Sequence, residues 1–154
     1  MTWDNEDGIL VRFGTERSTV STDGTDAGHQ EHVLEVVIDS QDILLVGDVN
    51  DDRPSLPANA VVTDALLIAT TAFVGTGTLT LGLSDSAGSA IDADGIDATI
   101  DVDAVLGNIG DVVACDGALV DKTASIGTVA GWVYGSIGGT VSAGVATLKL
   151  KYVV

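Results

Sequence analysis

Apolar and polar residues alternate one by one in three well-separated segments of this chain, at 33–39, 79–84 and 148–152. Side chains of a β-strand point alternately to its two faces, so this period of two predicts strands with one buried face. The three segments therefore limit the chain to folds built on sheets. The apolar positions are Leu34, Val36 and Ile38 in the first segment, Leu79, Leu81 and Leu83 in the second, and Leu148, Leu150 and Tyr152 in the third.

The most apolar stretch, residues 60–74, is rich in β-branched and aromatic side chains. Such side chains favour strands, so we expect one long central strand here, although Ala65–Ala69 alone would also suit a helix. The Gly-Thr-Gly sequence at 75–77 then predicts a turn that joins this strand to 79–84 as an antiparallel hairpin. A short apolar run at 43–46 is consistent with another strand, buried on both faces.

The second half of the chain predicts short elements separated by glycines. Residues 85–111 are acidic and favour loops, with one or two helical turns from Asp101 to Leu106. The elements expected after them are strands within 109–117 and over 132–134, and turns at 138–139 and 143–144 before the last strand.

Together these signals predict about eight short strands and no βαβ spacing, which argues against a parallel sheet. We expect an all-β protein, an antiparallel β-sandwich of the jelly-roll kind, over residues 33–154. Residues 1–32 are polar and irregular, with one possible short strand at 9–13, and are expected to form an N-terminal arm. This segment is either a mobile surface loop or an arm that docks on a neighbouring subunit by strand addition.

Charge excludes several classes of partner. The sequence has 23 acidic residues and only six basic ones, so the formal net charge is −17. Such a chain repels DNA, RNA and anionic membrane surfaces, and we expect neither nucleic acid nor membrane as a partner. No apolar run approaches the ~20 residues of a membrane helix, and the opening residues lack the basic and apolar regions of a secretory signal.

The acidic bias is also selective. Asp far exceeds Glu, Lys is nearly absent, and Ala, Gly, Val and Thr are frequent, which resembles the proteins of salt-accumulating haloarchaea and their viruses. Repulsion among like charges destabilises the compact state, and concentrated salt screens that repulsion. The alternative is an ordinary acidic β protein of a mesophile.

No motif for catalysis occurs in the sequence. The nucleophile elbow, the Walker loop and the dinucleotide-binding glycine pattern are all missing. Cys115 has no obvious histidine partner and is expected to be a buried, inert thiol. Paired carboxylates can hydrolyse glycosides, but nothing in the sequence marks a sugar cleft. We therefore expect no enzymatic activity.

Asp92, Asp94 and Asp97 form the most suggestive acidic cluster. Hard cations bind several carboxylate oxygens, and an intervening glycine allows the chain to curl around an ion. The EF-hand spacing is not met, so the three are weak candidates for a structural cation, with a hydrated acidic loop as the alternative. His29 and His32 could hold a metal only with ligands from elsewhere, and the alternative is two solvated loop histidines. No cofactor is expected.

Lys149 and Lys151 share the outward face of the last predicted strand. They either pair with an acidic neighbour strand or another acidic subunit, or mark an edge strand that lysines protect from aggregation. The stretch before them carries no charge from Ala124 to Leu148 and is rich in Gly, Ala and Thr. We expect the contact with other subunits within 123–146.

Five motifs follow one another after the N-terminal third of the chain: Ala65–Phe73, Leu79–Ser84, Asp94–Asp97, Cys115–Val120 and Gly139–Gly144. Their order resembles that of small virion proteins of tailed viruses, which serve as capsid decoration, cement or turret components. The resemblance covers roughly residues 60–154. It is a pattern of strands and turns and contains no catalytic signature.

This resemblance implies a capsid decoration or cement protein that binds the outside of the shell and stabilises it. Its partners would be the major capsid protein and further copies of itself, with a trimer favoured. It would sit on the capsid surface of the virion after assembly in the host cytoplasm. The alternatives are a vertex turret or tail-associated component and, in another class, a carbohydrate- or surface-binding β module. An exposed Trp3 or Trp132 beside a groove would favour that last alternative.

Overall fold

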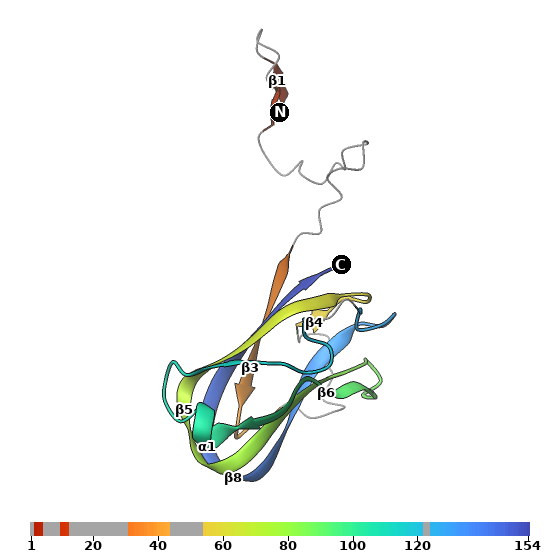
Figure 1. Cartoon of the computed structure of the whole chain (residues 1–154). Coiled ribbons are helices and arrows are strands. Elements are labelled where there is room, and N and C mark those ends of the chain that lie inside the picture. The colour runs from red at the N-terminus through yellow and green to blue at the C-terminus, as the bar shows by residue number, and fades with distance from the viewer. Residues whose placement is uncertain (1, 5–9, 13–30, 44–53, 122–123) are drawn as a thin grey trace.

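The computed structural model describes residues 2–4, 10–12, 31–43, 54–121 and 124–154. Most of this part of the chain is β-strand (Figure 1). A separate two-stranded sheet pairs β1 (Thr2–Asp4) with β2 (Leu10–Arg12), and β2 lies within the short strand predicted at 9–13. Residues 13–30 of the expected arm lie outside the described residues, and the domain boundary after residue 32 stays a prediction.

The main sheet has six strands, and every pairing in it is antiparallel. Its path runs β3-β8-β5-β6, while β4 pairs with β8 and β7 pairs with β5. The strand predicted over 33–39 is confirmed, whereas that at 43–46 lies outside the described residues except for Ile43. The strands are β3 (His32–Asp39), β4 (Ser55–Leu56), β5 (Val61–Ser84), β6 (Ala90–Asp101), β7 (Val112–Ala114) and β8 (Gly131–Val153).

Two very long strands, β5 with 24 residues and β8 with 23, form the frame of the fold. They pair with each other from end to end, from Val61 opposite Val153 to Ser84 opposite Trp132. The predicted hairpin with a turn at 75–77 is therefore wrong, because β5 continues through those residues. The turns predicted at 138–139 and 143–144 are wrong for the same reason. They lie inside β8.

β5 and β8 bend sharply where the sequence predicts turns, and glycines at the bend explain why the strands continue. Gly75 and Gly139 have φ angles of 121° and 96°, a region that L side chains rarely adopt. A Cβ on Gly75 would collide with the carbonyl oxygen of Thr140, and one on Gly139 would lie 2.5 Å from that of Thr76. The glycines that favour turns in the sequence thus let two paired strands bend together, with register shifts between Ala69 and Gly75.

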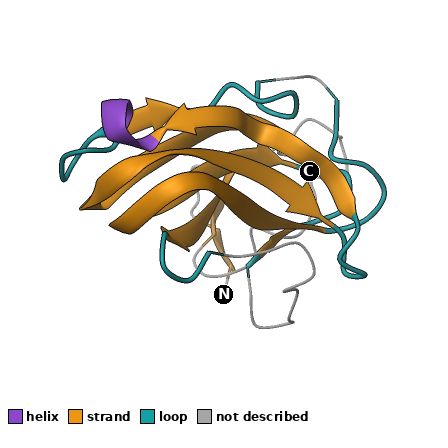
Figure 2. Cartoon of the chain, turned by 90° about the horizontal axis from the view of Figure 1, so that it is seen from below, coloured by secondary structure: helices purple, strands orange, loops and turns teal. Residues whose placement is uncertain are grey.

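The bend folds the sheet over into two layers (Figures 1 and 2). The first layer contains β3, the C-terminal half of β8, the N-terminal half of β5, and β7. The second contains β4, the other halves of β8 and β5, and β6. The expected antiparallel β-sandwich is confirmed, although two strands are shared by both layers and are far from short. Its jelly-roll character stays a prediction.

The core lies between the two layers and follows the alternation in the sequence. Leu79, Leu81 and Leu83 of the second layer are fully buried, and they belong to the same apolar cluster as Leu148 and Leu150 of the first. Full burial of one such side chain contributes about 1.5–3 kcal/mol. Burial of these apolar side chains therefore fixes which side of each strand faces the other layer.

The segment predicted as loops at 85–111 contains a strand that the sequence did not predict. Residues 90–101 form β6, while α1 (Val102–Val105) confirms the helical turn, with the Asp101 carboxylate accepting a hydrogen bond from the Ala104 N–H at 3.2 Å. β7 occupies only part of the strand predicted within 109–117. Within the described residues, no helix has the length and apolarity needed to cross a membrane.

Candidate interaction surface

The outward side of the first layer is a four-stranded surface that we call the outer face. Strand register brings residues from distant parts of the sequence together there, because β8 pairs with both β3 and β5, and β5 pairs with β7. Outward residues alternate with core residues along each strand. The outer face consists of Val33, Glu35 and Val37 on β3, Thr147, Lys149 and Lys151 on β8, Asp64, Leu66 and Ile68 on β5, and Val112 and Ala114 on β7.

A row of three apolar side chains and one threonine crosses the four strands of the outer face, and we call it the apolar row. Val37 pairs with Thr147, Thr147 with Ile68, and Ile68 with Val112. Val37 is 60% exposed and Val112 55%, which is high for large apolar side chains. Three strand spacings give this row a length of about 14 Å. Only Thr147 interrupts it, so it differs from the isolated apolar residues that are common on protein surfaces.

Two ion pairs lie beside the apolar row. Lys149 Nζ contacts Glu35 Oε1 at 2.9 Å on β3, and Lys151 Nζ contacts Asp64 Oδ2 at 3.5 Å on β5. Pairing with acidic neighbour strands was one of the two predictions for these lysines. The other, an edge strand protected by lysines, is wrong, because β8 has partners on both sides.

The acidic cluster Asp92, Asp94 and Asp97 lies on an irregular part of β6. Leu81 pairs with Asp97 and Leu83 with Asp92, so the intervening residues of β6 bulge out of the sheet. Asp94 is exposed, whereas Asp97 is buried. In the described part of the chain, no group of three or more His, Cys, Asp or Glu side chains is placed to hold a metal ion.

The bulge is fixed by backbone hydrogen bonds to the segment after β7. The N–H of Gly117 donates to the carbonyl oxygen of Ile96 at 2.9 Å, and that of Leu119 donates to Gly95 at 2.8 Å. Two of the motifs in the resemblance described above, 94–97 and 115–120, are therefore in direct contact. Their role in the described fold is to join β6 to this neighbouring segment.

Asp97 is a buried carboxylate, only 5% exposed, at the base of this bulge. Its Oδ1 accepts a hydrogen bond from the Thr99 N–H at 3.0 Å. Burial raises the pKa of Asp97, and the nearby charge of Asp116 raises it further, while the Thr99 hydrogen bond opposes the shift. A carboxyl group whose pKa is higher when folded makes the protein less stable as the pH rises through that pKa.

We therefore expect Asp97→Asn to stabilise the protein at neutral pH, where the variant has no buried charge. In a domain of this size, Tm is expected to rise by roughly 2–4 °C for each kcal/mol by which the free energy of unfolding increases. The gain should shrink as the pH falls toward the ordinary carboxyl range, where Asp97 itself becomes protonated. Thermal unfolding followed by circular dichroism between pH 3 and 7 measures both effects.

Asp94→Asn is the matched control, because it removes one charge from an exposed position in the same bulge. It should change Tm less than Asp97→Asn does at neutral pH. A lower Tm for Asp97→Asn at neutral pH would show that the carboxylate hydrogen bonds outweigh the cost of burying the charge.

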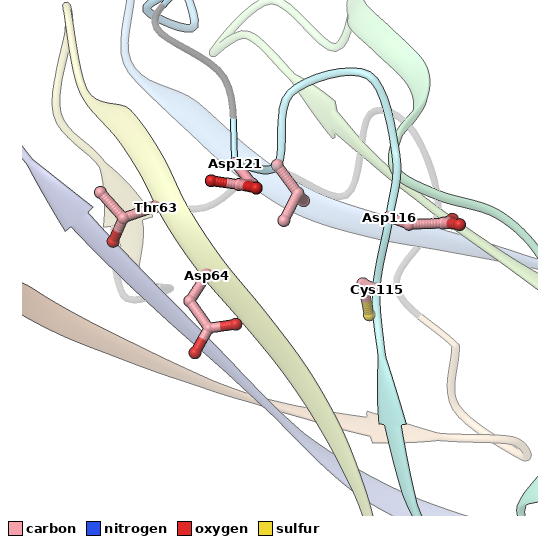
Figure 3. A pocket seen from close by; sticks show the side chains of 6 residues that line it. Thr63, Asp64, Cys115, Asp116 and Asp121 are labelled. Atoms are coloured by element: carbon pink, nitrogen blue, oxygen red, sulfur yellow. The ribbon is translucent and has the colours of Figure 1, made fainter.

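A pocket of about 440 Å³ lies between β5 and the segment that follows β7 (Figure 3). It is lined by Thr63, Asp64, Cys115, Asp116, Val120 and Asp121. The carboxylates of its three aspartates point in different directions (Figure 3), so the pocket does not gather them around one centre. Burial, with a smaller effect from the charge of Asp97, raises the pKa of Cys115 to about 12. The thiol is therefore neutral at physiological pH and a poor nucleophile, in agreement with the sequence prediction.

The remaining candidates from the sequence are dispersed. His32 stacks on Tyr152 with ring centroids 5.3 Å apart, and His29 lies outside the described residues. Trp132 is half-buried, its indole Nε1 is buried without a hydrogen-bond partner, and Tyr134 is 8% exposed. Neither ring offers the open stacking surface that sugar binding needs, and the side chain of Trp3 is outside the described part.

Two chains of known structure share this fold. One belongs to the capsid of Ralstonia phage GP4, with a TM-score of 0.50 and 23% identity over 79% of this chain and 84% of that chain. The other belongs to the capsid asymmetric unit of cyanophage Pam1, with a TM-score of 0.54 and 16% identity over 92% of this chain and 97% of that chain. Both alignments span most of both chains, so the match concerns the whole molecule. No family model matches the sequence, and no curated protein matches it.

The sequence identified only part of the outer face. The alternation at 148–152 places both lysines outward, but their partners Glu35 and Asp64 follow from strand register between distant segments. The apolar row was missed because Val37, Ile68 and Val112 are far apart in the chain, and nothing in the sequence alone joins them. The uncharged stretch 123–146, described from residue 124 on, is divided between a loop and the first part of β8, and its contact with other subunits stays a prediction.

Proposed function

We propose that this protein is a structural component of a virus particle, a decoration or cement protein that binds the outside of the capsid shell and stabilises it. The observation that carries the proposal is the whole-chain fold similarity to chains in the capsids of two phages. Because identity is below 25%, these matches establish the fold, and the role is inferred. The order of motifs in the sequence supports the same role independently.

The proposal includes a non-enzymatic role and self-association into a small ring, with the major capsid protein as the second partner. It is supported by the lack of catalytic motifs in the sequence and by the neutral thiol of Cys115. The net charge of −17 supports an origin in a virus of a salt-accumulating haloarchaeon, where concentrated salt would screen the repulsion. An acidic outward surface would also keep particles dispersed.

Quantitative mass spectrometry of purified virus particles tests this role, with the major capsid protein as internal standard for copy number. We expect this chain at a copy number of the same order as that standard. A handful of copies per particle would instead assign it to a vertex turret or to the tail. Absence from intact particles would refute a virion role and would favour a soluble binding module.

A further inference from the structure

The outer face differs from the rest of this acidic molecule in its charge balance. The chain carries a net charge of −17, yet on the outer face the two lysines pair with the acidic residues Glu35 and Asp64. Asp39, the next outward residue of β3, adds one acidic charge at the end of the strand. Lys149 and Lys151 are two of the six basic residues of the chain. Two molecules with a large charge of the same sign repel each other, and the repulsion is weakest where the local charge is closest to zero.

The arrangement of these charges is complementary to itself. The lysines form a basic column on β8, and acidic residues flank it on both sides, Glu35 on β3 and Asp64 on β5. When a second copy is displaced by one strand, one acidic residue of each copy, Glu35 or Asp64, can lie against the basic column of the other. One lysine of each copy can then contact carboxylates of both copies. All four side chains are substantially exposed, so their charges are available to a second molecule.

The apolar row supplies the contact that salt does not screen. Val37 and Val112 are more than half exposed, and Ile68 lies between them in the same row. Covering these side chains would remove apolar surface from water, which favours association. An apolar row beside paired charges has the composition of an interface centre with a polar rim.

We propose that the outer face binds a second copy of this chain, with Val37, Ile68 and Val112 as the apolar part of the contact. The proposal deepens the proposed function, because it assigns a surface to the expected self-association. It does not depend on a shell, since the isolated chain would associate through this face. Failure of one proposal therefore leaves the other open to its own test.

Sedimentation equilibrium of the full chain in molar KCl tests the proposal. Val37→Asp and Val112→Asp should each weaken self-association at least about tenfold, because each places an uncompensated charge in the apolar row. Val129→Asp is the matched control, since Val129 is 48% exposed and lies in the loop before β8, off the outer face. It should change the dissociation constant less than about twofold.

Circular dichroism verifies that each variant is folded. We expect all of them to fold, because the substituted side chains are exposed. The double variant Val37→Ser with Val112→Ser removes apolar surface without adding charge, and it should also weaken association. A wild-type chain that stays monomeric at every concentration reached would overturn the proposal. So would aspartate variants on the outer face that associate like the wild type, or an equal loss in Val129→Asp.

Discussion

Replacement of Gly139 by alanine is expected to lower Tm by roughly 6–12 °C, the shift that a loss of about 3 kcal/mol produces in a domain of this size. Two costs add up at this position. Gly139 has φ 96°, which is unfavourable for any residue with a Cβ. The added methyl group would also lie 2.5 Å from the Thr76 carbonyl oxygen and 2.8 Å from the Gly77 Cα, so the paired strand would have to move.

Gly138→Ala is the control for this prediction. Its added Cβ would meet only the Thr78 hydroxyl, at 3.2 Å, and that side chain can rotate away. Its backbone has no positive φ, so the substitution should change stability by less than about 1 kcal/mol. Thermal unfolding of both variants measures the difference. Equal Tm values would show that the bend of β5 and β8 does not require glycine at 139.

The Tm of the wild-type protein is expected to rise by on the order of 10 °C between 0.1 M and 2 M KCl. The net charge of −17 destabilises the compact state by self-repulsion. The Debye length falls from about 10 Å at 0.1 M to about 3 Å at 1 M, so the repulsion becomes largely screened. The two ion pairs of the outer face are weakened by the same screening, but exposed pairs contribute only about 0–1 kcal/mol each.

Differential scanning calorimetry over a series of KCl concentrations measures this effect. KCl is preferred to a sulfate salt, because sulfate stabilises folded proteins through exclusion from their surface. Sucrose serves as an uncharged control, and it should reproduce little of the salt response. A Tm that is constant from low to molar salt would contradict the inferred adaptation to a salt-rich host.

Local patterns in the sequence predicted the strand content and the inward residues of the fold. Alternation at 33–39, 79–84 and 148–152 identified core positions correctly, because side-chain direction along a strand is a local property. The helical turn after Asp101 was also predicted, since its cap is formed within four residues. The buried, unreactive state of Cys115 was predicted as the usual state of a lone cysteine without an obvious histidine partner.

The same patterns failed where the outcome depends on a distant segment. Gly-Thr-Gly at 75–77 is compatible with a turn or with a bend within a strand. Because β5 pairs with β8 through these residues, the segment forms a bend. The acidic stretch 90–101 favours loops by composition, yet it adds to the edge of β5 as a bulged strand. The composition of a segment does not reveal which distant strand will form hydrogen bonds with its backbone.

The sequence by itself thus determined that the chain is an acidic, antiparallel β protein, which residues of three strands point to its core, and that its last strand points two lysines outward. Only the tertiary structure decided that β5 and β8 are continuous and shared by two layers, and that Glu35, Asp64, Val37, Ile68 and Val112 meet on one face. The physical reason is that burial and side-chain direction depend on neighbours along the chain. Register, bending and surface rows depend on backbone hydrogen bonds between segments far apart in sequence.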